Sequence, residues 1–282
     1  MSKVALITDS TGNLPANFVN EYSITVVPQV LIWGDETFED GVDIQPSEFY
    51  ERLKNAKQMP STSQVTPKSF LQAYQEHLDK GDEVLCVLIS EKLSGTIASA
   101  VQAKQSFANS PIEIVDSETT SLAMGFVVLK AAEAIKQGAN LKEAKEVAEQ
   151  AVNHVGVVFA VDTLEFLHRG GRIGGGSRFL GTALNIKPIL EVRDGRVEAV
   201  ERVRTRAKSL NRLVELAEQG INGKQPVRLA VLHADAYDEA SQLLEQASAR
   251  IENVQAFLAE VSPVIGTHAG PGTVGLAWMT GG

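Results

Sequence analysis

The sequence predicts a two-domain α/β protein: an N-terminal α/β domain built on a parallel sheet, then a C-terminal α+β domain with a mostly antiparallel sheet. In the first half, short apolar runs alternate with helical patterns, as in strand–helix–strand units. In the second half, Asp194-Gly195 separates two β-rich runs and predicts a hairpin. The chain has 282 residues, 44% of them apolar, which suffices for two cores. We expect domains at 1–158 and 159–282.

Four strands are predicted in the first half from short runs of apolar residues. They cover residues 4–8, 24–33, 84–89 and 112–115. Pro28 interrupts the second run and indicates an edge or a break there, because proline has no amide hydrogen for a sheet. The only cysteine, Cys86, lies inside the third run, so we expect a buried thiol rather than a reactive one.

Four helices are predicted around these strands. The first follows Thr66 as N-cap, has Pro67 at its first position and ends at Gly81. One face of this helix is apolar: Phe70, Tyr74 and Leu78. The second begins near residue 95, and its apolar face is Ile97, Ala100 and Val101. The other two cover residues 124–135 and 141–153, and the apolar residues 124–129 are expected in the core or in the wall of a ligand tunnel.

The second half is predicted to contain six strands and two amphipathic helices. The strands cover residues 157–161, 186–192, 197–203, 228–233, 256–261 and 273–279. The helical stripes are Leu210, Leu213, Val214 and Ala217, then Ala240, Leu243, Leu244, Ala247 and Ile251. His168 is expected in a further short helix before the glycine-rich segment 170–176. A hairpin combined with helices is typical of an α+β domain.

The composition argues against several classes of protein. Lys and Arg total 26 against 35 Asp and Glu, and the net charge of -9 opposes binding to nucleic acid or to an anionic membrane. The N-terminal apolar run is too short for a signal peptide, and no run reaches membrane length. A single cysteine suits a reducing compartment, so we expect a cytoplasmic protein. The histidines and the lone cysteine lack metal-ligand spacing.

The stretch P-S-T-S-Q-V-T-P at residues 60–67 gathers neutral hydrogen-bonding side chains between two prolines. One interpretation is a surface loop, because Ser, Thr and Pro are common turn residues. The other is a site for an anion, in which Thr66 caps the next helix and Thr62, Ser63 and Gln64 face the ligand. Both interpretations place these residues in a loop.

A second cluster of hydroxyl-bearing residues follows the predicted strand 84–89. There Ser94, Gly95 and Thr96 begin a helix, where free N–H groups and the helix dipole favour an anion and glycine allows a close approach. Ligands of open α/β sheets collect at such strand ends. The alternative is that Ser94 only caps the helix. We expect the two hydroxyl-rich stretches to converge on one carboxylate or phosphate.

His268 lies in I-G-T-H-A-G-P-G, which we expect to be a tight loop before the last strand. A formal G-x-G-x-x-G ends at Gly275, but too few residues follow it for a dinucleotide-binding unit. One alternative function is a serine hydrolase, with Ser94 as nucleophile, His268 as base and Asp9 or Asp116 as the orienting acid. Against it, the nucleophile elbow G-x-S-x-G is missing.

Arginines are concentrated in the second half: Arg169, Arg172, Arg178, Arg193, Arg196, Arg202, Arg204 and Arg206. In an acidic chain this local excess is either a solvated face or a docking surface for an acidic or phosphate-bearing partner.

Six stretches follow one another in order along nearly the whole chain: I-T-D-S-T (7–11), P-S-T-S-Q (60–64), L-S-G-T (93–96), I-V-D-S (114–117), L-E-F-L-H-R-G-G-R-I (164–173) and I-G-T-H-A-G-P-G (265–272). Together they resemble the DegV family of fatty-acid-binding proteins, the lipid-binding components of bacterial fatty acid kinase systems. Two positions depart from the family pattern. Val65 stands where proline is usual, and Glu91-Lys92 stand where two serines are frequent.

The resemblance implies a long-chain fatty acid such as palmitate between two domains, and no cofactor or metal. It implies that Thr62 and Ser94 bind the carboxylate, with His268 near the head group and Arg172 as a further member. Beside them we place Ser63, Gly95 and Thr96. Some family members present their fatty acid to a separate kinase that makes an acyl phosphate. Such a subunit would dock on the Arg-rich C-terminal domain, and this chain would be a lipid-binding protein rather than an enzyme.

Overall fold

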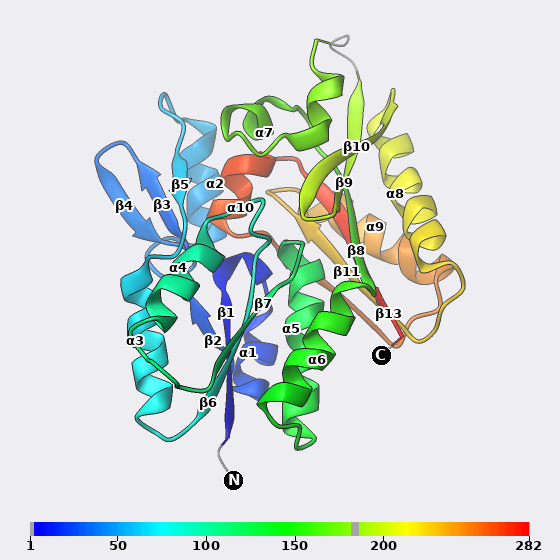
Figure 1. Ribbon diagram of the computed structural model, residues 1–282. Coiled ribbons are helices and arrows are strands. Elements are labelled where there is room, and N and C mark those ends of the chain that lie inside the picture. Colours follow the sequence, from blue (N-terminus) through cyan, green and yellow to red (C-terminus); the bar gives the residue numbers. More distant parts are fainter. Residues whose placement is uncertain (1–2, 182–185, 282) are drawn as a thin grey trace.

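The computed structural model describes residues 3–181 and 186–281 and contains three sheets flanked by helices (Figure 1). A four-stranded parallel sheet belongs to the first half, and a six-stranded, mostly antiparallel sheet to the second. A small three-stranded sheet lies in the first half as well. The predicted fold class is therefore confirmed.

The parallel sheet has the order β2-β1-β6-β7. Its strands are β1 (Val4–Asp9), β2 (Thr25–Val27), β6 (Glu83–Leu88) and β7 (Ile112–Asp116). Side chains alternate between its faces, so Cys86 lies in one core and Leu85 in the other. The helices of the first face are α3 (Pro67–Leu78) and α4 (Thr96–Lys104); those of the second are α1 (Ala16–Tyr22), α5 (Ser121–Lys136) and α6 (Leu141–Val152).

Helix α3 begins as predicted, because Thr66 Oγ1 accepts a hydrogen bond from Ser69 N and Pro67 is in the first turn. The predicted apolar face of α4 is wrong in part, since Val101 is 45% exposed. Small side chains turn toward the core instead: Thr96, Ser99, Ala100 and Ala103. They let α4 lie close to α3 and β7, and this rotation leaves Val101 in solvent.

Helix α5 lies between the two large sheets, where it contacts β1 and β6 on one side and β8, β11 and β13 on the other (Figure 1). Residues 122–129 are all buried. A helix that is apolar on every side is typical of such a fully buried position. The segment 124–129 is therefore core, and α5 joins the two halves into one hydrophobic cluster.

The six-stranded sheet has the order β10-β9-β8-β13-β11-β12, and only the pair β11–β12 is parallel. Its strands are β8 (Val155–Ala160), β9 (Lys187–Arg193), β10 (Arg196–Val203), β11 (Val227–His233), β12 (Gln255–Glu260) and β13 (Val274–Thr280). The predicted hairpin joins β9 and β10, and Asp194 and Gly195 both have positive φ, as a tight turn of this type needs. Two helices cover the outer face: α8 (Arg206–Ile221) and α9 (Tyr237–Arg250).

The three-stranded sheet confirms one sequence-based expectation and overturns another. Its strands are β3 (Val30–Trp33), β4 (Glu36–Glu39) and β5 (Ser61–Ser63), and helix α2 (Pro46–Lys54) accompanies them. Pro28 does break the run 24–33, and the pieces β2 and β3 enter different sheets. The loop expected at 60–67 is wrong for Ser61–Ser63, which pair with β3 as an edge strand. Edge strands tolerate polar residues, so this one has no apolar signal.

Besides α10 (Pro263–Ala269), the described part of the chain has three further short helical segments: the 3₁₀ helix η1 (Ser10–Gly12), α7 (Glu165–Arg169) with His168 as expected, and the 3₁₀ helix η2 (Gly174–Phe179). The loop expected around His268 is wrong, because His268 lies in helix α10 (Pro263–Ala269). Ser262 caps this helix and Pro263 begins it. Asp40 Oδ1, from the first half, accepts a hydrogen bond of 3.1 Å from Val264 N in α10.

The chain passes into the second half at β8, whose first residue is Val155. The division at residue 158 lies inside this strand and stays a prediction. Within residues 3–181 and 186–281, no helix combines the length and the apolar character that crossing a bilayer would require.

Candidate functional site

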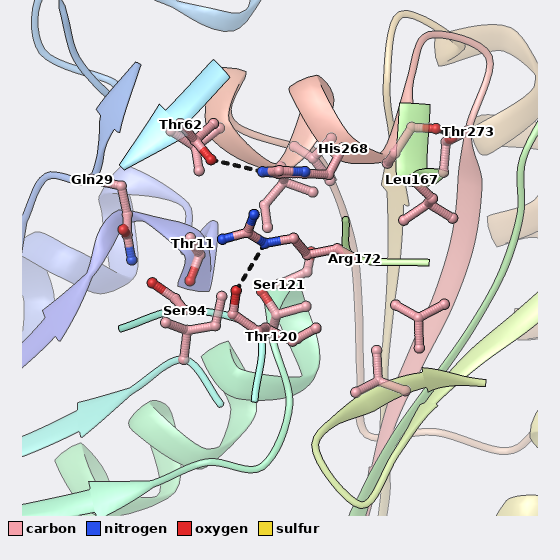
Figure 2. Close-up of a pocket in the computed structure, with 18 of the residues that line it drawn as sticks. Thr11, Gln29, Thr62, Ser94, Thr120, Ser121, Leu167, Arg172, His268 and Thr273 are labelled. Atoms are coloured by element: carbon pink, nitrogen blue, oxygen red, sulfur yellow. Dashed lines mark hydrogen bonds between the residues drawn. The ribbon is translucent and has the colours of Figure 1, made fainter. Parts of the chain in front are cut away.

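One cavity extends from the loops of the first half to the inner face of the six-stranded sheet, and Figure 2 shows its polar end beside its apolar end. Its polar lining residues are Thr11, Gln29, Thr62, Ser63, Gln64, Ser94, Thr120, Ser121, Arg172, His268 and Thr273. Its apolar lining residues are Ile89, Leu93, Val157, Phe159, Leu167, Val192, Val197, Leu232, Val261, Val264, Ile265 and Ala269.

The polar end lies at the carboxyl ends of three neighbouring parallel strands. Thr11 follows β1, Ser94 follows β6, and Thr120 and Ser121 follow β7. Because parallel strands end at the same edge of the sheet, hydroxyl side chains from distant parts of the chain meet there. The N-terminus of the 16-residue helix α5 also lies at this edge and adds the positive end of its dipole.

The two hydroxyl-rich stretches identified in the sequence do converge. Strand β5 brings Thr62 and Ser63 to the cavity, and the loop after β6 brings Ser94. Gly95 and Thr96 do not line it. Gly95 is the N-cap of α4, and the Gln64 side chain lies 3.0 Å from where a β-carbon at this position would be. Thr96 is fully buried behind Ser94, and a direct role for either residue in binding stays a prediction.

His268 contacts Thr62 across the two halves of the chain, with 2.7 Å between His268 Nε2 and Thr62 Oγ1 (Figure 2). Burial, assisted by the positive charge of Arg172, lowers the pKa of His268 to about 4, so the ring is neutral near pH 7. His268 Nδ1 is buried and has no hydrogen-bond partner in the part of the chain that the structure describes. An unpaired N–H is costlier than an unpaired lone pair, so the hydrogen belongs on Nε2.

This tautomer decides what Thr62 can do. If His268 Nε2–H donates to Thr62 Oγ1, the hydroxyl hydrogen of Thr62 is left for another acceptor. Thr62 then offers the cavity a hydrogen-bond donor, which is what an anionic ligand requires.

Arg172 brings a positive charge to the same end. Its Nε donates to Leu93 O at 3.1 Å, and its Nη1 donates to Gly170 O at 2.7 Å. Among the described residues, no Asp or Glu forms an ion pair with it. Figure 2 shows the guanidinium between Thr62 and His268 on one side and Thr11 and Thr120 on the other. A half-buried guanidinium without a carboxylate favours an anion beside it.

Five polar lining residues were missed by the sequence-based reasoning about the site: Thr11, Gln29, Thr120, Ser121 and Thr273, the last of which is expected only as the start of a strand. The signal was present for three of them, because D-S-T-G after β1 and D-S-E-T-T-S after β7 are hydroxyl-rich strand ends like the one after β6. Thr120 Oγ1 is buried and lacks a partner among the described residues, so it is a further unused polar group. Gln29 carries no comparable signal.

The apolar end is made mostly by the other half of the molecule, with Leu93 of the first half packed against it. Strand β8 contributes Val157 and Phe159, and α7 contributes Leu167. Val192 and Val197 come from the two strands of the hairpin. Charged side chains are absent from this end within the described lining, so the site is a polar head chamber joined to an apolar one.

The hydrogen bonds do not support the hydrolase alternative. Ser94 Oγ bonds to Thr96, and His268 bonds to Thr62, so the two are not paired as nucleophile and base. Asp9 is bonded to Thr11, Gln29 and the amide of Ile89, and none of its bonds reaches His268. Asp116 accepts from the amides of Glu91 and Glu118.

The arginine-rich region is only partly paired. Arg169, Arg193 and Arg206 form ion pairs with Glu165, Glu191 and Glu239, respectively. Arg178 and Arg202 instead flank the ring of Phe179 at 5.4 and 5.2 Å. A docking role for this surface stays a prediction. Within the described residues, no group of three or more His, Cys, Asp or Glu side chains could hold a metal ion.

Comparison with known proteins identifies the family and the fold of the chain. The profile of the family described as "Uncharacterised protein, DegV family" matches residues 3–281. Protein DegV of Bacillus subtilis is 35% identical over 277 residues, which is 98% of each chain. A Thermus thermophilus structure, described as fatty acid binding of a DegV family protein, is 35% identical with a TM-score of 0.93 over 99% of both chains. The Bacillus subtilis DegV structure, described as a fatty acid binding protein, is 32% identical with a TM-score of 0.87 over 100% of both chains.

Proposed function

The chain belongs to the DegV family, and from this membership and the shape of the cavity we propose that it binds one long-chain fatty acid between its two halves. Two solved relatives described as fatty acid binding support the class of ligand. The observation that carries the proposal is a single cavity with hydroxyls and an unpaired arginine at one end and mostly apolar side chains at the other, where the hydroxyl of Thr273 is bonded to Ala269 O.

The head of the acid is assigned to the polar end. Thr62 and Ser94 donate hydroxyl hydrogens to the carboxylate, with Ser63 beside them. Arg172 balances the charge, and neutral His268 orients Thr62. Hydrogen bonds to a charged group contribute more than neutral ones, about 1.5–3 kcal/mol each. This end therefore sets the direction of the ligand and the preference for an acid.

The tail is assigned to the apolar end. Each CH₂ removed from water contributes about 0.8 kcal/mol, so a sixteen-carbon chain offers on the order of 10 kcal/mol before the entropy of binding is subtracted. Tail burial is thus the main source of affinity. The matching sequence feature is a set of inward-facing residues on the six-stranded sheet that includes Val157, Phe159 and Leu232.

We propose further that the chain carries the acid without transforming it and presents it to a separate kinase. The polar end adjoins a second pocket that shares Thr62, Arg172 and His268 with the first and also includes Arg169. This arrangement gives a second protein a route to the carboxylate. The loaded chain alone should leave ATP intact, and acyl phosphate should form only when a kinase is added. Consumption of ATP by the chain alone would contradict the carrier role.

The binding proposal is tested by native mass spectrometry of the purified protein and by extraction of its lipid. We expect a mass excess that matches one fatty acid. Ser94→Ala and Thr62→Val should weaken palmitate binding by about tenfold each and leave hexadecanol binding nearly unchanged, because only the acid uses charge-assisted hydrogen bonds. Ser61→Ala, which changes an exposed neighbour on β5, is the matched control. A protein with no affinity for any fatty acid would remove the proposal.

A further inference from the structure

A chain of hydrogen bonds runs behind Ser94 through three buried residues, of which only Thr96 belongs to the expected binding set. Asp9 Oδ1 accepts from Gln29 Nε2 at 3.2 Å. The same nitrogen lies 2.9 Å from Thr96 Oγ1, and Thr96 Oγ1 lies 2.9 Å from Ser94 Oγ. The exposed fractions of Asp9, Gln29 and Thr96 are 1%, 2% and 0%. Figure 2 shows Gln29 and Ser94 at the same end of the cavity.

The chemistry of these groups fixes the direction of every bond. Asp9 Oδ1 accepts from the backbone N–H of Thr11 and Oδ2 from that of Ile89, so both oxygens act as acceptors, and the amide nitrogen of Gln29, not its oxygen, faces Oδ1. The second hydrogen on this nitrogen then goes to Thr96 Oγ1. A hydroxyl has one hydrogen, and the single acceptor left beside Thr96 Oγ1 among its described partners is Ser94 Oγ. Thr96 therefore donates to Ser94.

Ser94 Oγ accepts a second time, from the backbone N–H of Thr96 at 3.3 Å. Both of its acceptor positions are then occupied, and its own hydrogen has no acceptor among the described residues. Since Ser94 lines the cavity, this hydrogen is available to a ligand.

We propose that Asp9, Gln29 and Thr96 are positioning residues that hold the Ser94 hydroxyl as a donor toward the carboxylate of the bound acid. This inference rests on the proposed function. Without the relay, Ser94 could turn its hydrogen back to Thr96 Oγ1 and present a lone pair to the anion. The Thr62 hydroxyl, which faces the head group from the other half, is held as a donor in the same way, because the Nε2–H of His268 donates to it. Both hydroxyls that face the head group are thus fixed as donors, which selects an ionised acid over an ester or an alcohol.

The test uses a change that keeps shape but removes a hydroxyl. We expect Thr96→Val to lower the affinity for palmitate at least about tenfold and to leave the affinity for hexadecanol unchanged. Thr96→Ser should restore palmitate binding, because it restores the donor. The two lipids share one tail, so hexadecanol binding reports directly whether the variant has folded with its cavity intact.

A double-mutant cycle separates a positioning role from a merely structural one. If Thr96 acts through Ser94, then Ser94→Ala combined with Thr96→Val should bind palmitate as weakly as Ser94→Ala alone. Gln29→Glu is the second variant, because its carboxyl accepts from Thr96 and so reverses the relay. It too should have no further effect when Ser94 is alanine.

The outcomes distinguish this inference from the proposed function. Failure of the unaltered protein to bind palmitate removes both. Binding that is weakened by Ser94→Ala but unchanged by Thr96→Val and Gln29→Glu overturns the relay alone. Losses that simply add in the double variants also overturn it, since they would place the effect of Thr96 outside Ser94.

Discussion

The two ends of the cavity are built by opposite means. The polar end consists of side chains from strand ends and short segments far apart in sequence, such as Thr11, Thr62 and His268, held by directional hydrogen bonds. The apolar end is largely one face of a regular sheet, with Val157 and Phe159 two residues apart on β8. Binding at the polar end depends on the placement of single atoms, whereas binding at the apolar end depends on the buried apolar area. Direction and affinity should therefore respond to different changes.

The largest expected effect comes from the tail. Shortening the ligand from palmitate to laurate removes four CH₂ groups and should weaken binding by about 3 kcal/mol, roughly two hundredfold. Calorimetry or competition binding with the two acids measures this ratio. The same ratio is expected for Ser94→Ala, because the head group does not decide how the tail is buried. A ratio that changes in this variant would mean that the two ends are coupled.

The next effect concerns pH and His268. Its pKa is 6.5 in the unfolded chain and about 4 in the folded protein. Between these pH values the unfolded chain therefore binds a proton that the folded protein does not bind. The free energy of unfolding should thus decrease as the pH falls from 6.5, by about 3 kcal/mol at pH 4. Burial raises the pKa of Asp9 and of Asp40, so these two carboxyls make the free energy of unfolding increase as the pH falls.

Comparison with His268→Asn isolates the histidine contribution, since both carboxyls remain in the variant. Urea denaturation of the two proteins at pH 7 and pH 4 gives the four free energies that are needed. If the two proteins lose the same stability between these pH values, the neutral buried state of His268 is wrong.

A smaller effect is expected for the charge at the polar end. Arg172→Ala should lower the affinity for palmitate by about 2 kcal/mol, roughly thirtyfold, and change hexadecanol binding much less. Arg169→Ala is the control, because Arg169 lies three residues away but is exposed and paired with Glu165. Equal losses from the two variants would indicate a general field rather than a contact at the head group.

The smallest expected effect concerns a single atom of the polar end, the hydroxyl oxygen of Thr120. Thr120 Oγ1 is buried without a partner, so Thr120→Val should leave the free energy of unfolding unchanged or raise it. The same change should weaken palmitate binding by about 1 kcal/mol, because a donor at the α5 N-terminus is lost. Thermal unfolding and binding measured on one preparation test both signs. A loss of stability without a loss of binding would place Thr120 outside the head group site.

What the sequence predicts well is local. The cap at Thr66, the turn at Asp194-Gly195 and the break at Pro28 each depend on backbone chemistry within a few residues, and all three are confirmed. The sequence does not predict strand β5, because its residues are polar and show no alternation of apolar side chains. The sequence predicts a loop in place of helix α10, because the nearby glycines outweigh the helix start at Ser262-Pro263.

The site divides in the same way. Ser94 was identified because it follows a strong strand signal, and Thr62 because hydroxyls cluster around it. Their convergence follows from tertiary structure, which local pattern does not encode. Gln29 could not be predicted at all, because its role arises from contacts with Asp9 and Thr96, 20 and 67 residues away.

The burial of α5 on every side has a consequence for the life of the chain in the cell. A fragment that ends near residue 158 would leave the side of α5 that faces β11 and β13 exposed to water as an apolar surface. During synthesis, the first half should therefore stay incompletely folded and prone to aggregation until the last strand, β13, has emerged. Even a short C-terminal truncation that removes β13 should then prevent folding of the whole chain rather than remove one strand from a folded protein.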